Sequence, residues 1–227
     1  MSLAALTRAA SSDDREGSSF KFTFGHYQYA DNAGQDVNVR WQYGNSHSWV
    51  GYYHDPDFGT QTRIGWDNAY DLNDWLTLQP SVQAATRGFL GGSLNAQVGH
   101  DWFGIVGLGR TNLKPYFNLN FDPNDAITLG GGHAFDNGQT WTLFVISDNR
   151  THTQQTDWHL LGRIPFGAER LTFDLMQKSG QSDVGFIRAW GTSVTWDYPS
   201  WFVRVARDPK QNFSANDAWR LSLGFRY

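Results

Sequence analysis

Residues Trp219–Tyr227 read WRLSLGFRY, and this stretch decides the fold class. Apolar side chains occupy every second position, from Trp219 to Tyr227, while Arg220 and Arg226 stand among the residues between them. Successive side chains of a β-strand point to opposite faces, so a period of two is the period of a strand. The stretch therefore predicts a strand with one apolar face and one polar face.

The same alternation recurs along the chain. Its apolar faces are formed by Phe20, Phe22 and Phe24; by Val37, Val39, Trp41 and Tyr43; by Leu90, Gly92, Leu94, Ala96 and Val98; by Phe117, Leu119 and Phe121; and by Leu171, Phe173 and Leu175. Turn-forming residues such as Gly44-Asn45 and Asp136-Asn137-Gly138 separate these segments. The pattern predicts an all-β meander of antiparallel hairpins rather than βαβ units.

The apolar faces favour a membrane barrel over a soluble sandwich. Aromatic residues make up 16% of the chain, and transmembrane barrels carry aromatic girdles at both membrane interfaces. A last strand that ends on an aromatic residue, here Tyr227, resembles the assembly signal of outer-membrane barrels. We therefore expect an antiparallel transmembrane β-barrel in a bacterial outer membrane, with residues 1–18 as a disordered lead-in and residues 19–227 as a single barrel domain.

The strand count is expected to be 12 to 14. About 15 segments qualify as candidate strands, but a bacterial barrel with both termini in the periplasm needs an even number. At least one candidate should then be a loop or a split strand. Residues 88–112 and 140–148 are the segments where we expect this exception.

The charges follow the strand faces. If the apolar face of each strand points outward, ten of the 18 basic residues point into the lumen. These predicted pore-lining and substrate-binding residues are Lys21, Arg40, Arg63, Lys114, Arg163, Arg170, Lys178, Arg204, Arg220 and Arg226. Of the 22 acidic residues, only Asp174 and Asp157 are expected at inward strand positions. Most lumen bases thus lack an obvious acidic partner.

Unpaired like charges in a narrow lumen repel one another, and a permeating anion can compensate for them. Rings of Arg and Lys select anions, and Arg binds planar carboxylates with two hydrogen bonds. The sequence therefore predicts a channel for passive, anion-selective diffusion of small acidic solutes such as acidic oligosaccharides. The alternative is that loop aspartates fold inward, neutralise the bases and close the lumen with a plug of ion pairs.

Two further classes stay open, an outer-membrane acyl or lipid hydrolase and a soluble carbohydrate-binding β-sandwich. No G-x-S-x-G motif occurs, and the acids lie mostly in turns, so no catalytic residues are assigned.

A net charge of −4 argues against nucleic acid as a partner. With no Cys, thiolate metal sites are excluded, and no cofactor or metal is expected. The run His54-Asp55-Pro56-Asp57 is the one place where a His and two acids could hold a cation.

Some short stretches resemble a known family. The run Tyr70-Asp71-Leu72-Asn73-Asp74 and the following Leu76–Pro80 look like a periplasmic turn and strand of the oligogalacturonate-specific porins and their sialic-acid porin relatives. Lys114-Pro115-Tyr116 and the last strand are also similar. The resemblance implies a monomeric twelve-stranded barrel in outer-membrane lipid, with arginine tracks for acidic oligosaccharides. It supports Lys114 and either Arg220 or Arg226 as track members. Between Pro80 and Lys114 the chain has about one hairpin more than that pattern.

One substitution tests the inward assignment. Replacing Arg170 and Arg220 with Glu should lower the anion preference of the pore without unfolding the barrel, because both changes stay on the polar faces of their strands. The reversal potential in a planar bilayer under a KCl gradient measures this preference. Unchanged permeability ratios would rule out a lumen position for these residues.

Overall fold

A computed structural model describes residues 19–120, 122–150 and 152–227. The predicted lead-in, residues 1–18, lies outside these residues. The strands are β1 Ser19–Gln28, β2 Ala33–Tyr43, β3 Ser46–Asp55, β4 Gly59–Asn68, β5 Tyr70–Asn73, β6 Leu76–Ala85, β7 Phe89–Gly99, β8 Trp102–Thr111, β9 Ala126–Ala134, β10 Thr140–Asp148, β11 Thr156–Phe166, β12 Glu169–Ser182, β13 Gly185–Asp197, β14 Trp201–Asp208 and β15 Ala218–Arg226. Two short 3₁₀ turns, η2 Thr86–Gly88 and η3 Gln211–Phe213, complete the described elements.

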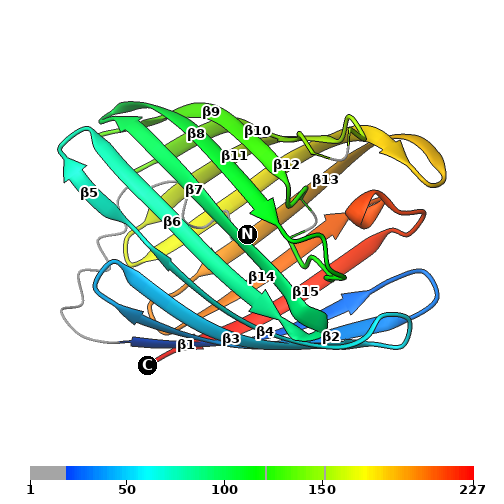
Figure 1. Ribbon diagram of the computed structural model, residues 1–227. Helices are drawn as coiled ribbons and strands as arrows, with labels where there is room; N and C mark the ends of the chain where they lie inside the picture. The colour runs from blue at the N-terminus through cyan, green and yellow to red at the C-terminus, as the bar shows by residue number, and fades with distance from the viewer. Residues whose placement is uncertain (1–18, 121, 151) are drawn as a thin grey trace.

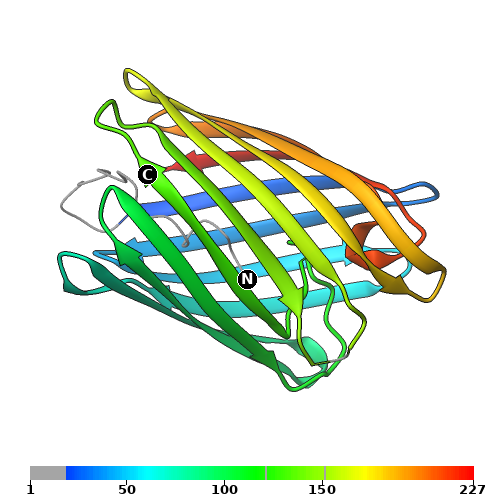
Figure 2. The ribbon, with the colours of Figure 1, turned by 90° about the horizontal axis from the view of Figure 1, so that it is seen from above.

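The strands form one closed antiparallel barrel (Figures 1 and 2). Strand β1 pairs with β15, and the pairing of β4 with β6 closes the sheet. Strands β4 and β5 both pair with β6, end to end, and together count as one barrel strand. The barrel thus has fourteen strands, at the upper end of the predicted range. The chain has one hairpin more than the twelve strands that the family resemblance implies.

The split strand was predicted in the wrong place. Residues 88–112 and 140–148 form the full-length strands β7, β8 and β10, whereas the interruption falls at Ala69. There the backbone N–H of Ala69 donates to the side chain of Asn68 and to the carbonyl of Asn45. An Asn side chain that binds the backbone beside it competes with a strand ladder, which explains the break.

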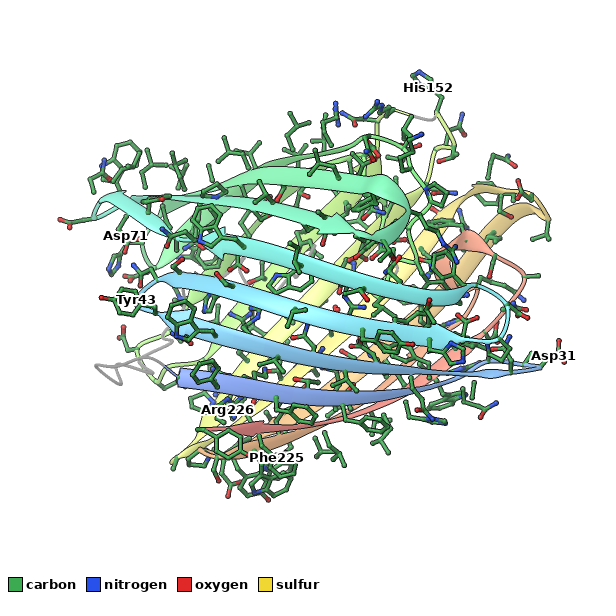
Figure 3. The ribbon with its side chains drawn as sticks, turned by 60° about the horizontal axis from the view of Figure 1, so that its bottom comes forward. Asp31, Tyr43, Asp71, His152, Phe225 and Arg226 are labelled. Carbon is green, nitrogen blue, oxygen red and sulfur yellow. The ribbon has the colours of Figure 1, made fainter. Side chains whose placement is uncertain are left out.

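The two ends of the barrel differ. The near end, where β1 begins and β15 ends, has the turns 44–45, 74–75, 100–101, 135–139, 167–168 and 198–200. The far end has the connections 29–32, 56–58, 86–88, 112–125, 149–155, 183–184 and 209–217. Figure 3 shows Tyr43 and Asp71 at the near end and Asp31 at the far end. Bacterial barrels have short periplasmic turns and longer extracellular loops, so the near end corresponds to the periplasmic side.

The outer surface is an apolar belt. Outward side chains such as Leu94, Leu129 and Leu143 are about half exposed, at 52%, 52% and 53%. Exposed aromatic residues lie near both ends, for example Trp102 at the near end and Trp190 toward the far end. A continuous apolar band between aromatic girdles is the lipid-facing surface of a transmembrane barrel. Among the described residues, no helix is long and apolar enough to cross a membrane.

The inner surface has an apolar wall. Phe103 and Ile105 on β8, Phe144 on β10 and Leu161 on β11 are buried inside the barrel. The glycine run 130–132 lies beside this wall: a Cβ on Gly130 or Gly132 would collide with Phe144 or the Phe103 ring. Close packing inside the barrel therefore accounts for the glycines.

One predicted strand is a loop. The alternation at Phe117 and Leu119 belongs to the connection 112–125, which turns into the lumen instead of joining the sheet, and Phe121 lies outside the described residues. The Phe117 ring stacks on Tyr53 with ring centroids 4.5 Å apart. The backbone of Phe117 exchanges two hydrogen bonds with the Gln61 side chain, at 3.0 and 2.9 Å. The side chains of Phe117 and Leu119 thus pack inside the barrel, against the wall formed by β1–β4.

The base of this loop is held by one carboxylate. The N–H and the hydroxyl of Thr111 and the guanidinium of Arg150 all donate to Asp125, the last at 2.7 Å. Burial raises the pKa of Asp125, but the hydrogen bonds from Thr111 and the charge of Arg150 outweigh it and hold that pKa below its usual value. The folded loop therefore favours the ionised carboxylate.

Lipid-facing positions should tolerate charge only near the ends. Replacing Val106, an outward residue in the middle of β8, with Arg should cost about 2–4 kcal/mol of unfolding free energy, because the guanidinium enters the hydrocarbon layer. Leu108→Arg, closer to the far end, should cost less, since the chain itself carries Arg110 one outward position further. Denaturant titration in phospholipid vesicles measures both. Equal, small costs at the two positions would contradict a lipid-facing β8.

The stability that the Asp125 hydrogen bonds give to the loop should depend on pH. A carboxylate whose pKa is lowered by folding stabilises the loop above its unfolded pKa of about 3.9, and this contribution is lost as pH falls through the lowered value. Asp125→Asn should therefore speed amide hydrogen exchange in the 112–120 segment about tenfold at pH 7. Wild type and variant should converge at strongly acidic pH. The same exchange rate in both proteins at pH 7 would show that Asp125 does not hold the loop.

Candidate functional site: the charged lumen

The continuous sheet arranges inward side chains in rows. Residues in register on neighbouring strands lie side by side across β11–β15 and β1. Successive inward rows are two residues apart, about 6.8 Å along a strand. From the near end, we name them the near-end row (Arg226, Lys21, Arg40), the Asp197 row (Arg170, Asp197, Phe202), the arginine row (Arg163, Thr172, Thr195, Arg204, Ser222) and the mixed row (Leu161, Asp174, Ser193, Ala206, Arg220, Tyr27).

A cavity of about 300 Å³ runs along these rows. Its wall comes from β1 and β11–β15, together with Asn120 and Asp122 of the β8–β9 connection, residues 112–125, which we call the inward loop. Its charged lining residues are Lys21, Arg163, Arg170, Arg204, Arg207, Arg220 and Arg226 on the basic side, and Asp122, Asp174, Asp197 and Asp208 on the acidic side. The cavity is therefore polar and predominantly basic, with acids concentrated at particular levels.

Several lumen bases have acidic partners, contrary to the sequence prediction. Asp197 accepts from both Arg170, at 3.3 Å, and Arg226. Three further bases are paired by acids of β2, β4 and β14. These pairs are Arg63 with Asp36 at 2.5 Å, Arg40 with Asp67 at 3.9 Å and Lys178 with Asp208 at 2.6 Å. The prediction assigned these acids to turns and strand ends. An inward position close to the end of a strand, however, still faces the lumen.

Three cations keep a net positive charge on the lining. None of the described carboxylates forms an ion pair with Lys21, Arg204 or Arg220. The Lys21 ammonium lies 4.2 Å from the centroid of the Phe202 ring. Arg204 donates to the Thr195 hydroxyl at 2.8 Å, and Arg220 donates to the Leu119 carbonyl at 3.2 Å. Neutral partners orient these groups without cancelling their charge, so the lining attracts anions.

The inward loop narrows the lumen beside these cations. Tyr116 stacks on Phe89 of β7, with centroids 4.0 Å apart. On the other side, Asp122 lies 3.3 Å from Nε2 of His159, whose Nδ1 is 3.0 Å from Asp174. The loop thus contacts both β7 and the β11–β12 part of the wall, and its Asn120 and Asp122 lie on the cavity surface.

The structure places all but one of the predicted pore-lining bases at inward strand positions. Lys114 is the exception, because it lies on an exposed stretch of the inward loop and not at a strand start. The inward positions predicted for Asp157 and Asp174 are confirmed by full burial of the first and a cavity-lining place for the second. Sequence reasoning missed His159, Asp122 and Asp208. Alternation on β11 and β14 could have indicated His159 and Asp208, whereas no local signal indicated Asp122.

No metal centre is visible in the described ranges. None of their His, Cys, Asp and Glu side chains gather in a group of three that could hold a metal ion. In the run His54–Asp57, the Asp55 carboxylate accepts the backbone N–H groups of Asp57 and Phe58 at 2.7 and 2.6 Å. This is the Asx-turn role that an aspartate plays in a tight connection.

A closed barrel with an apolar outer belt and a polar lumen is an outer-membrane architecture, and it places this chain in a bacterial outer membrane. No known family model matches the chain, and no curated protein matches it in sequence.

Solved structures match at the level of the fold. The outer membrane protein Omp33 of Acinetobacter baumannii matches with a TM-score of 0.60 and 10% identity, over 92% of this chain and 97% of that one. A KdgM porin matches with a TM-score of 0.49 and 11% identity, over 90% and 98%. A NanC porin matches with a TM-score of 0.47 and 10% identity, over 91% and 98%. At these identities the likeness concerns the barrel fold alone.

Proposed function

We propose that this protein is a pore for passive diffusion across the outer membrane, with a preference for small acidic solutes. The proposal rests on one observation above all: Lys21, Arg204 and Arg220 lie on the cavity wall without an acidic partner among the described residues. The barrel provides the path, and these three cations provide the sign of the selectivity. We further propose that the barrel acts as a monomer in outer-membrane lipid, which the family resemblance implies.

The electrostatics favour anions over cations. At physiological salt the Debye length is about 8 Å, comparable to the radius of a small pore, so fixed charges on the wall act throughout its cross-section. Asp197 cancels only part of the charge of Arg170 and Arg226, since one carboxylate serves two guanidinium groups. A carboxylate solute can therefore replace lost hydration with contacts to the arginine row.

The cavity volume limits the size of the solute. About 300 Å³ is at the small end of ligand-binding sites and suits a single sugar acid or a comparable carboxylate. A longer acidic oligosaccharide would pass in extended form, one residue at a time, along the rows. The inward loop also prevents free passage of large solutes, because its contacts with Tyr53 of β3 and with His159 of β11 reach opposite walls of the barrel.

The test uses the refolded protein in a planar bilayer under a KCl gradient. Wild-type reversal potentials should indicate anion preference, and Arg204→Gln should lower the anion-to-cation permeability ratio by about threefold, because one uncompensated charge is removed from the wall. Arg188→Gln serves as the matched control, since Arg188 is exposed on β13 at an outward position and should leave the ratio unchanged. Cation preference in wild type, or equal effects of the two variants, would exclude the proposal.

A further inference from the structure

The lumen charges are segregated along the barrel axis. The near-end, Asp197 and arginine rows carry mainly bases across β11–β15 and β1. Toward the far end the acids accumulate: Asp174 shares the mixed row with Arg220, and Asp208 of β14 lies one inward step further, where Asp122 of the inward loop meets His159. The cavity wall therefore has a positive half and a negative half.

The negative half is not neutralised by its own bases. The three carboxylates that line this half, those of Asp122, Asp174 and Asp208, pair with two bases, Lys178 and His159. Lys178 pairs with Asp208 at 2.6 Å, and His159 lies between Asp122 and Asp174 at 3.3 and 3.0 Å. Asp157 is fully buried beside this half and does not line the cavity.

Both halves are accessible from the same cavity. Asp122, Asp174 and Asp208 line it together with Arg163, Arg204 and Arg220. Asp174 keeps 21% of its side chain exposed there, and the arginine row lies one inward step away, about 6.8 Å along the strand. A solute in this cavity can therefore contact a carboxylate wall and a guanidinium wall at once.

We propose that the preferred solutes of this pore are zwitterions whose ammonium and carboxylate groups lie about 7 Å apart, such as short peptides, because an acidic half and a basic half adjoin along the axis of one cavity. The ammonium binds among Asp174 and Asp122, and the carboxylate binds at Arg204 and Arg163. The proposal rests on the pore function: among the solutes that bear a carboxylate, it favours those that also bear an ammonium group. Two extended peptide residues span about 7 Å, which matches one step between rows.

The physical basis is complementarity at both ends of the solute. A purely anionic solute gains at the arginine row but is repelled by the far-end carboxylates. A dipolar solute is attracted at both, and the field between the two halves orients it. A neutral solute of the same size gains neither contact.

The test compares two net-neutral solutes, so that no counter-ion movement interferes. Proteoliposomes containing the wild-type protein are diluted into iso-osmotic diglycine or N-acetylglycinamide, and the initial swelling rates are measured. We expect diglycine to enter about threefold faster or more, although it carries two full charges. Glycine and acetamide, whose lengths do not span one row step, should differ less.

A variant assigns the effect to the acidic half. Asp174→Asn keeps the size and hydrogen bonding of the side chain but removes its charge, and it should reduce the diglycine advantage toward unity. Asp183→Asn, in the exposed β12–β13 turn, is the matched control and should retain the advantage. If Asp174→Asn does not fold, Asp122→Asn on the inward loop makes the same test.

The outcomes separate this inference from the pore function. Equal entry of diglycine and N-acetylglycinamide through a pore that still prefers anions would overturn the zwitterion assignment alone. A diglycine advantage that survives in both acidic variants would also overturn it. Absence of current and of swelling with every solute would instead overturn the pore function itself.

Discussion

Backbone hydrogen bonding in a hydrocarbon layer is the constraint on which the rest of this structure depends. No water is available there for an unpaired N–H or C=O, so the sheet must close on itself. The pairing of β4 with β6 achieves closure, even though the chain breaks the strand at Ala69. Closure in turn fixes the side-chain alternation, with one set of residues facing lipid and the other facing the lumen. Every charge on the membrane-spanning part of a strand is thereby directed inward.

Because these charges point inward, like charges lie close together in the lumen and repel one another. Bases from neighbouring strands lie next to one another in register, as Arg226, Lys21 and Arg40 do. Aspartates near strand ends form ion pairs with some of these bases. Others contact neutral groups such as the Phe202 ring or the Thr195 hydroxyl. The inward loop adds apolar contacts at one wall and a carboxylate at the other, so the lumen is narrowed without being uniformly neutralised. In the proposed function, a charged solute compensates for the remaining charge.

The fold was largely predictable from sequence because a period of two is local information. WRLSLGFRY and its counterparts determine both the strands and their lipid-facing sides. The inward loop was not predictable in the same way: Phe117 and Leu119 alternate like a strand, but their apolar faces meet Tyr53 and Tyr27, residues distant in sequence. Asp36 and Asp208 looked like residues of strand ends, although alternation with Val37 and Arg207 directs them inward. The partner of a lumen charge depends on the register between strands, which a single sequence does not encode locally.

Selectivity by the lumen charges requires that the charged cavity lie on the conduction path. The chain has no Cys, so single cysteines can be placed without background. Thr195→Cys lies inside the cavity, and Val194→Cys is its lipid-facing neighbour on β13. A membrane-impermeant, negatively charged thiol reagent is added while the current through each variant is recorded in a planar bilayer. Current should fall for the Thr195 variant alone; no loss at Thr195, or an equal loss at Val194, would contradict a conduction path through the cavity.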